Sequence, residues 1–360
     1  MPVVSRLLFD DDLIKYCVLK PKKVLLIRFS SIGDIVLTSP VARCLKEQLG
    51  AEVHFLTKRA YRGIVDANPH IDKVYALHDS FGALIRELRE EKYDAIVDLH
   101  HNLRSWKVKL GLRVTPTLAF NKLNLEKWLM VHFKINRLPK VHIVDRYLAA
   151  AAPLGIVNDG KGLDYFIPPG QEVALLDLSH LFSLEKEIRE YVLEGRYLAF
   201  VIGAAHATKR LPVHKIVSIC QQVRLPVLLL GGVEDQQTGE TIANAAGAHV
   251  LNGCGKFSLH QSASLVSQAF RVITHDTGLM HIAAAFRKEI LSVWGNTIPE
   301  FGMAPYYPEG IWANTCVQVP ALPCRPCSKI GFQKCPKAHF RCMEGIDEKQ
   351  IASISNGGLI

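Results

Sequence analysis

The amino-acid sequence predicts an α/β protein built from two doubly wound parallel sheets. Three observations support this fold class. Short apolar runs alternate with amphipathic stretches, as in VLLIRF at 24–29 followed by VARCLKEQL at 41–49. The same alternation starts afresh with YLAFVIGA at 197–204, after a mixed and charged segment. Strands that alternate with helices form parallel sheets with helices on both faces.

The individual elements follow from the same pattern. The first series continues with a strand EVHFLT, a helix SFGALIRELREEKY and a strand DAIVDLH. The second series contains four further strands, PVLLLGG, HVLNG, RVITHDT and EILSVWG, separated by amphipathic or apolar helices. Ligands of open α/β sheets bind beyond the carboxyl ends of the strands, so two facing sheets create a cleft between them.

The length also predicts two domains, because 360 residues exceed what one hydrophobic core usually organises. No run approaches the roughly 20 apolar residues of a membrane span, and the opening MPVVSRLLFDDDLIKYC lacks the order of a signal peptide. We therefore expect a cytoplasmic protein. The expected segments are an N-terminal extension (1–21), an N-terminal Rossmann-like domain (22–175), a C-terminal Rossmann-like domain (176–345) and a C-terminal tail (346–360).

The positive charge is concentrated in the first half of the chain. Residues 1–170 contain 26 Lys and Arg against 18 Asp and Glu, whereas residues 171–360 contain 17 against 16. Such a field attracts anions, including the phosphates of a lipid headgroup or an acidic sugar. A solvated basic surface without a partner is the alternative. No nucleic-acid-binding motif is present, so we expect no nucleic-acid partner.

Nine cysteines form no obvious disulfide framework, because their number is odd. Five are scattered, and four fall within residues 324–342. In a reducing cytoplasm this cluster is a candidate for one structural Zn²⁺, with His339 as a substitute ligand. The first pair has the usual two-residue spacing, while the gap in the second pair is unusual. Reduced, unliganded thiols are the alternative for the cluster, which comprises Cys324, Cys327, Cys335 and Cys342.

The loop RFSSIGD at 28–34 follows the first predicted strand. A small glycine-containing loop at a strand end lets the backbone approach a ligand, and it directs Asp34 towards the cleft. The alternative is that Asp34 caps a short helix, a common role for aspartate at such a position.

Two further strand ends carry charged residues. HATKRLP at 206–212 places Lys209 and Arg210 beside a proline that opens a helix, which suits an anion at the helix N-terminus. A basic surface turn is the alternative. Glu234 follows the strand PVLLLGG, where a carboxylate can accept both hydroxyls of a ribose. A solvated acidic loop is the alternative there.

The segment RVITHDTGLMHIAAAF at 271–286 predicts a buried strand that turns directly into an apolar helix. Asp276 and Thr277 can cap this helix, while Gly278 and the residues after it offer N–H donors to a diphosphate. His281 lies one turn further and faces either the ligand or the core. The following loop, WGNTIPEFGMAPYYP at 294–308, is suited to a lid or to contacts with a base.

These segments, in this order, resemble the ADP-heptose:lipopolysaccharide heptosyltransferases of glycosyltransferase family 9. The resemblance runs from about Lys22 to Glu344 and rests on SSIGDIVLTSPV, KRLP, GGVED, HDTGLMHIAAA and WGNTIPEF. It implies the GT-B fold, in which the N-terminal domain binds the acceptor and the C-terminal domain binds the nucleotide sugar.

The resemblance also implies residue roles. Asp34 is the implied general base, Lys209 contacts the donor phosphates and Glu234 binds the donor ribose. The implied donor site comprises Lys209, Arg210, Glu234, Asp276, Thr277, Gly278, Leu279, Met280 and His281. The implied acceptor site comprises Ser31, Gly33, Lys58, Arg59, Arg62 and Arg104.

The implied reaction is an inverting, metal-independent transfer of heptose, from ADP-L-glycero-D-manno-heptose to the lipopolysaccharide inner core. The implied setting is the cytoplasm, in peripheral contact with the inner membrane. The loop HHNLR at 100–104 and the N-terminal extension depart from the pattern, so the acceptor stays open. Another nucleotide sugar or acceptor, a nucleotide-sugar epimerase or hydrolase, and an inactive binding protein are the alternatives.

Overall fold

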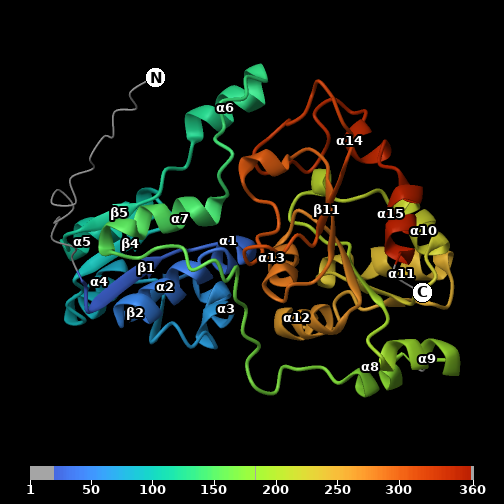
Figure 1. Cartoon of the computed structure of the whole chain (residues 1–360), viewed down its shortest axis with the longest axis horizontal. Coiled ribbons are helices and arrows are strands. Elements are labelled where there is room, and N and C mark those ends of the chain that lie inside the picture. The colour runs from blue at the N-terminus through green and yellow to red at the C-terminus, as the bar shows by residue number, and fades with distance from the viewer. Residues whose placement is uncertain (1–19, 183, 358–360) are drawn as a thin grey trace, which may run out of the picture.

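The computed structural model describes residues 20–182 and 184–357, in two halves that lie side by side (Figure 1). The first half contains a five-stranded parallel sheet in the order β3-β2-β1-β4-β5. Alternate residues of β1 enter different cores, with Val24 and Leu26 on one face and Leu25 and Ile27 on the other. The strands are β1 (Lys23–Ile27), β2 (Glu52–Thr57), β3 (Lys73–Ala76), β4 (Ala95–Asp98) and β5 (Thr117–Ala119).

The helices of the first half follow the strands as in a doubly wound fold, and α6 projects away from the sheet (Figure 1). No residue of α6 is buried, in contrast to α2 and α7, which pack on the sheet. The helices are α1 (Ile32–Val36), α2 (Ser39–Leu49), α3 (Gly63–Asp66), α4 (Phe81–Glu90), α5 (Leu103–Leu112), α6 (Asn124–Phe133) and α7 (Ile143–Ala151).

The second half contains a six-stranded parallel sheet in the order β11-β10-β9-β6-β7-β8. Its strands are β6 (Leu198–Val201), β7 (Val227–Leu230), β8 (Val250–Asn252), β9 (Arg271–His275), β10 (Ile290–Trp294) and β11 (Asn314–Gln318). Its helices are α8 (Leu175–Leu181), α9 (Lys186–Leu193), α10 (Val213–Gln222), α11 (Gln236–Ala246), α12 (Leu259–Gln268), α13 (Gly278–Ala285), α14 (Arg341–Glu344) and α15 (Glu348–Asn356).

An irregular segment at 156–174 connects the halves and is fixed to both. Arg43 of α2 pairs with Asp159 at 2.7 Å and also with Asp164. The backbone N–H of Val173 donates to Ser264 of α12 at 3.0 Å. The two sheets are therefore held by contacts at both ends of the connection.

The predicted fold class is confirmed, and the part of the predicted N-terminal extension up to residue 19 lies outside the described residues. The segment predicted as a C-terminal tail, 346–360, contains helix α15 (Glu348–Asn356). Ile351 and Ala352 of α15 are buried, and α15 packs against α10. The buried apolar face of α15 therefore holds this segment against α10.

Candidate active site

A cavity of about 780 Å³ lies between the two halves. The carboxyl ends of both sheets open into it, as expected for facing doubly wound sheets. The first half contributes Arg28 and Asp34, which follow β1. The second half contributes Lys209, Glu234 and Asp276, which follow β6, β7 and β9. Five residues distant in sequence thus share one cavity.

Asp34 is held by residues of its own loop. Its Oδ1 pairs with Arg28 Nη2 at 2.6 Å, and its Oδ2 accepts hydrogen bonds from Ser31 N at 3.1 Å and Ser31 Oγ at 2.8 Å. The carboxylate is 22% exposed and lines the cavity. Asp34 also sits three residues after the N-cap Ser31, so the helix-cap geometry and the cleft-facing geometry occur together.

The charge state of Asp34 follows from these contacts. Burial raises the pKa of its carboxyl group, but the Arg28 charge and the hydrogen bonds from Ser31 outweigh that effect and leave the pKa below its usual range. Arg28 is itself anchored, because it donates to Tyr147 Oη at 2.9 Å and to the Leu99 carbonyl. Asp34 is therefore ionised at neutral pH and fixed in direction.

His281 closes the cavity where α1 and α13 meet. A Cβ atom on Gly33 would lie 2.5 Å from His281 Cδ2, and one on Gly278 would lie 2.7 Å from Ile32 Cγ2. Only glycine permits this approach of the two halves. Burial lowers the pKa of His281 to about 4, and its Nδ1 is buried with no hydrogen-bond partner among the described residues. The imidazole is therefore neutral at pH 7.

Lys209 and Asp276 form a tight pair on the opposite wall. Lys209 Nζ lies 2.6 Å from Asp276 Oδ2, which also accepts a hydrogen bond from Thr297 Oγ1 at 3.0 Å. The pair is mostly buried, yet both residues line the cavity. Asp276 thus fixes the direction of the Lys209 ammonium group.

Glu234 is exposed and lines the same cavity, whereas its neighbour Asp235 is buried. Asp235 accepts hydrogen bonds from Gly232 N at 3.0 Å and pairs with Arg210 at 2.9 Å. Arg210 also donates to the Ala204 carbonyl at 2.8 Å and does not line the cavity. Of the predicted residues on these two loops, the structure brings Lys209 and Glu234 to the cavity and leaves Arg210 beside it.

The N-terminus of α13 faces the cavity through Thr277, Gly278 and Leu279. Thr277 is the N-cap, but its side chain caps no backbone N–H, so the first-turn donors stay free of a side-chain partner. Met280 is fully buried in the core and does not line the cavity. Successive residues of a helix are rotated by about 100° around its axis. Leu279 therefore faces the cavity while Met280, the next residue, faces the core.

Only some of the predicted acceptor residues line the cavity. Ser31 and Gly33 line the cavity, but the basic residues Lys58, Arg59, Arg62 and Arg104 do not. Arg59 and Arg62 instead border a surface groove of about 630 Å³ near β3. Three lysines that the sequence did not single out line the cavity in their place: Lys122, Lys127 and Lys329.

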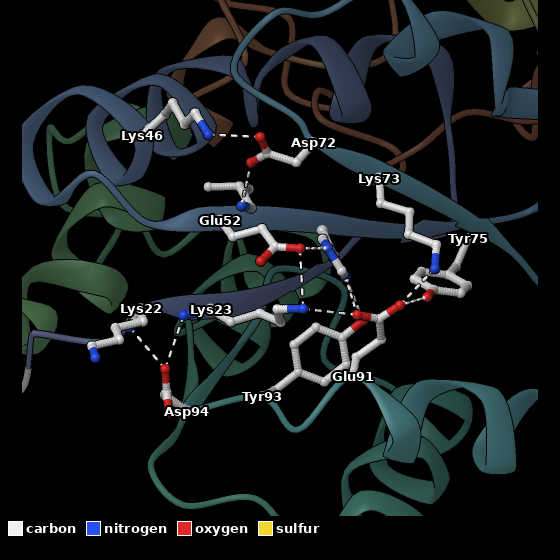
Figure 2. A network of polar contacts seen from close by, with 12 residues as sticks. Lys22, Lys23, Lys46, Glu52, Asp72, Lys73, Tyr75, Glu91, Tyr93 and Asp94 are labelled. Atoms are coloured by element: carbon white, nitrogen blue, oxygen red, sulfur yellow. Dashed lines mark hydrogen bonds and ion pairs between the residues drawn. The ribbon is translucent and has the colours of Figure 1, made fainter.

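Figure 2 shows another polar cluster, around Glu52 and Glu91. The ligand atoms of Glu52, His54 and Glu91 lie within 4.8 Å of one another. Lysines already neutralise it. Glu91 pairs with Lys23 at 2.8 Å and with Lys73 at 2.6 Å, and Glu52 pairs with Lys23 at 3.0 Å. These contacts tie β1, β2 and β3 to the end of α4, which is a structural role.

The cysteine-rich segment forms part of the cavity wall through Lys329 and Ile330. Burial, helped by the thiols of Cys327, Cys335 and Cys324, raises the pKa of Cys342 to about 11. The thiols of these four cysteines therefore act on one another electrostatically. Among the described residues, no three of them lie within 4.8 Å of one another.

Two doubly wound sheets that face a shared cavity are the architecture of the GT-B glycosyltransferases. Residues 81–333 match the model of glycosyltransferase family 9 (heptosyltransferase), and the chain belongs to this family. The chain is a glycosyltransferase.

Relatives agree with this assignment. The chain is 23% identical over 302 residues to a lipooligosaccharide heptosyltransferase 2 of Haemophilus influenzae, covering 77% of this chain and 84% of that protein. Its fold is similar to a glycosyltransferase family 9 protein of Veillonella parvula, with a TM-score of 0.71, 19% identity and coverage of 93% and 96%. It is also similar to the ADP-heptose lipopolysaccharide heptosyltransferase II of Escherichia coli, with a TM-score of 0.66, 19% identity and coverage of 92% and 96%.

Proposed function

We propose that this protein transfers a heptose from ADP-L-glycero-D-manno-heptose to a lipopolysaccharide inner-core acceptor, with inversion at the anomeric carbon. The observation that supports this most is that a carboxylate from one half and an ammonium group from the other half line the same cavity. An ionised Asp34 lies on the first half, and Lys209, held by Asp276, lies on the second. Relatives with heptosyltransferase names support the choice of sugar.

The proposed step is a single displacement. The acceptor hydroxyl oxygen forms a bond to the anomeric carbon as the bond to the diphosphate oxygen breaks. The hydroxyl proton passes to Asp34, whose pKa keeps it ionised before the reaction. The low pKa does not prevent this transfer, because the hydroxyl becomes far more acidic as the new bond forms.

The leaving diphosphate gains negative charge in the same step. Lys209 and the free N–H groups at the start of α13 are the proposed stabilising groups. Glu234 is exposed at the cavity after β7, which suits it to the donor ribose. The proposed donor side therefore lies on the second half, and the acceptor side lies next to Asp34.

The test is a thermal-shift panel of nucleotide diphosphate sugars, followed by transfer assays with a lipopolysaccharide inner-core acceptor. We expect ADP-L-glycero-D-manno-heptose to raise the unfolding midpoint most, because at equal concentration the ligand with the lowest Kd stabilises the folded protein most. Donor turnover that needs no acceptor would instead identify an epimerase or a hydrolase. A different donor at the top of the panel would overturn the choice of heptose.

We also propose that Cys324, Cys327, Cys335 and Cys342 hold one structural zinc ion. This requires these thiols to move closer together, because no three of them lie within 4.8 Å of one another in the described residues. Thiolates suit zinc, and also iron, so elemental analysis of protein purified without added metal should measure both. About one zinc per chain is the expected result. About one iron per chain would show that the site binds iron and not zinc. A protein with neither zinc nor iron would reject the metal site.

Peripheral contact with the cytoplasmic face of the inner membrane is the remaining part of the proposal. Helix α6 supports it, because Leu125, Trp128 and Phe133 are 64%, 48% and 58% exposed on a helix that buries no residue. Residues 99–144 carry nine Lys and Arg against one acidic residue, Glu126. Exposed aromatic residues among cations are typical of helices that bind anionic membranes.

A further inference from the structure

Three lysines from separate parts of the chain line the cavity that also contains Asp34. Lys122 follows β5, Lys127 lies on α6, and Lys329 belongs to the cysteine-rich segment. Each lines the cavity. Lys122 and Lys127 are half-buried, and Lys329 is exposed.

Within the described part of the chain, the ammonium groups of these three lysines form no ion pair and donate no hydrogen bond. The Lys127 ammonium group lies 6.0 Å from the centre of the Phe301 ring. The nearby carboxylates are engaged elsewhere, since Asp34 pairs with Arg28 and Asp98 pairs with Lys109. Their ammonium groups therefore face the cavity without a counter-ion. A cation that is partly removed from water without a partner is unfavourable unless a ligand supplies the negative charge.

The charges also act on one another. Burial, together with Arg146, Lys329 and Lys122, lowers the pKa of Lys127 to about 8, while Asp34 opposes the shift. Burial and the charges of Arg28 and Lys329 lower the pKa of Lys122. Arg146 adds to this field, because its Nε and Nη1 are buried with no hydrogen-bond partner among the described residues. An anion in the cavity would relieve all of these repulsions.

This cluster is separate from the donor-side charges. Lys122 and Lys127 belong to the same half as the proposed base Asp34, and all three line the cavity. Lys209 is already paired with Asp276 on the other half. The anion that fits the three lysines is therefore carried by the acceptor rather than by the donor.

The backbone around Lys329 is fixed. The backbone N–H of Cys327 donates to the Asn296 carbonyl at 3.2 Å. The backbone N–H of Phe332 donates to Thr208 Oγ1 at 2.8 Å, and Thr208 Oγ1 donates to the Phe332 carbonyl at 3.0 Å. Lys134 of the first half donates to the Pro326 carbonyl at 2.7 Å. The cysteine-rich segment thus bridges the two halves and presents Lys329 to the cavity.

We propose that Lys122, Lys127 and Lys329 form an anion-binding subsite that takes a carboxylate or phosphate group on the acceptor, next to the hydroxyl that attacks. This inference rests on the proposed transfer reaction. It moves the acceptor contacts from Lys58, Arg59, Arg62 and Arg104 to three lysines at the cavity. It also gives the cysteine-rich segment a part in acceptor selection.

The first test measures binding directly and needs no transfer reaction. Citrate and inorganic phosphate are titrated separately into the full chain saturated with ADP, and binding is followed by calorimetry. We expect the preferred anion to lose about ten- to hundredfold in affinity in Lys127→Gln and in Lys329→Gln, because each removes a charge-assisted contact. Citrate preference would indicate a carboxylate group, and phosphate preference a phosphate group.

The pH dependence has a defined sign. Lys127 is charged below its pKa of about 8 and neutral above it, so affinity for the anion should fall as the pH rises through that value. Lys127→Gln should remove this loss. The control is Lys186→Gln, which replaces an exposed lysine of α9 that lies outside the cavity. It should bind the anion as the unmodified protein does.

The second test measures the KM for acceptor and the Kd for ADP in each variant. A rise in KM of about ten- to hundredfold with an unchanged Kd supports the subsite. Anion affinity and KM that are unchanged in Lys122→Gln, Lys127→Gln and Lys329→Gln would overturn it, as would effects confined to Lys58→Gln. If no nucleotide sugar is transferred at all, the proposed function fails while the direct titration still decides the subsite.

Discussion

Asp34 shows how one side chain satisfies two interpretations of the same sequence. It accepts the backbone N–H of Ser31, as a helix-capping residue does, and it also pairs with Arg28 at the cavity. The sequence predicted the position, because a carboxylate after a buried strand faces the ligand edge of a sheet. The Arg28 contact that keeps it ionised was not predicted, because it depends on side-chain direction.

Other residues at the cavity differ in how far the sequence could predict them. Lys209 and Glu234 follow strands directly, so strand prediction places them. Lys122, Lys127 and Lys329 come from three segments without any shared spacing, and only the folded chain brings them together. The resemblance implies a donor-site role for both Leu279 and Met280, but the helical turn directs Met280 into the core.

Lys209→Ala should weaken binding of the nucleotide sugar by about ten- to hundredfold, because a charge-assisted contact to the diphosphate is lost. Asp276→Ala should weaken it less, because Asp276 acts by positioning Lys209 at 2.6 Å. Calorimetric titration with ADP measures both variants.

The double variant separates a positioning role from a direct one. If Asp276 acts through Lys209, the double variant should bind ADP as Lys209→Ala does, with strongly non-additive effects. Unchanged affinity in both single variants would contradict the assignment of this pair to the donor.

The contact between α1 and α13 brings the two proposed sides of the reaction together. Its closeness depends on Gly33 and Gly278, which leave no room for a side chain. The interior strands on either side were predictable because their residues are apolar and buried. The edge strands β3, β5 and β11 were not predicted, because they are short or half-exposed and lack a continuous apolar run.

Gly33→Ala should lower both stability and turnover. The added Cβ would lie 2.5 Å from the buried ring of His281, and overpacking of this kind typically costs about 1 to 3 kcal/mol. Thermal unfolding and kcat measure the two effects. The matched control is Gly82→Ala on α4, where a Cβ meets nothing within 4 Å, so stability should stay or rise. An unfolding midpoint for Gly33→Ala equal to that of Gly82→Ala would contradict the tight contact.

The fold shows where the excess positive charge of the first half lies. The positive excess of the first half is concentrated in residues 99–144, around α5 and α6. No helix in the described residues is long and apolar enough to cross a membrane. In Figure 1, α6 stands clear of the first sheet. Its aromatic residues Trp128 and Phe133 are exposed.

Replacing Leu125, Trp128 and Phe133 together by Gln should reduce binding to phosphatidylglycerol vesicles by more than about tenfold, because three buried apolar contacts with the lipid are lost. Vesicle co-sedimentation measures the effect, and phosphatidylcholine vesicles should bind weakly throughout. Trp312→Gln is the control, since Trp312 is 95% exposed on the other half. Equal vesicle binding by the triple variant would remove α6 from the membrane contact.

The rate of heptose transfer by Asp34→Asn decides whether Asp34 is the base. Asparagine keeps the size and can still accept the hydrogen bonds from Ser31 at 3.1 and 2.8 Å, but it cannot take a proton. We expect transfer to slow by about 10² to 10⁴-fold, with nearly unchanged affinity for ADP. The unfolding midpoint should fall, because the buried Arg28 loses the carboxylate with which it pairs at 2.6 Å. Turnover near that of the unmodified protein, with the same acceptor and donor, would show that Asp34 only caps α1.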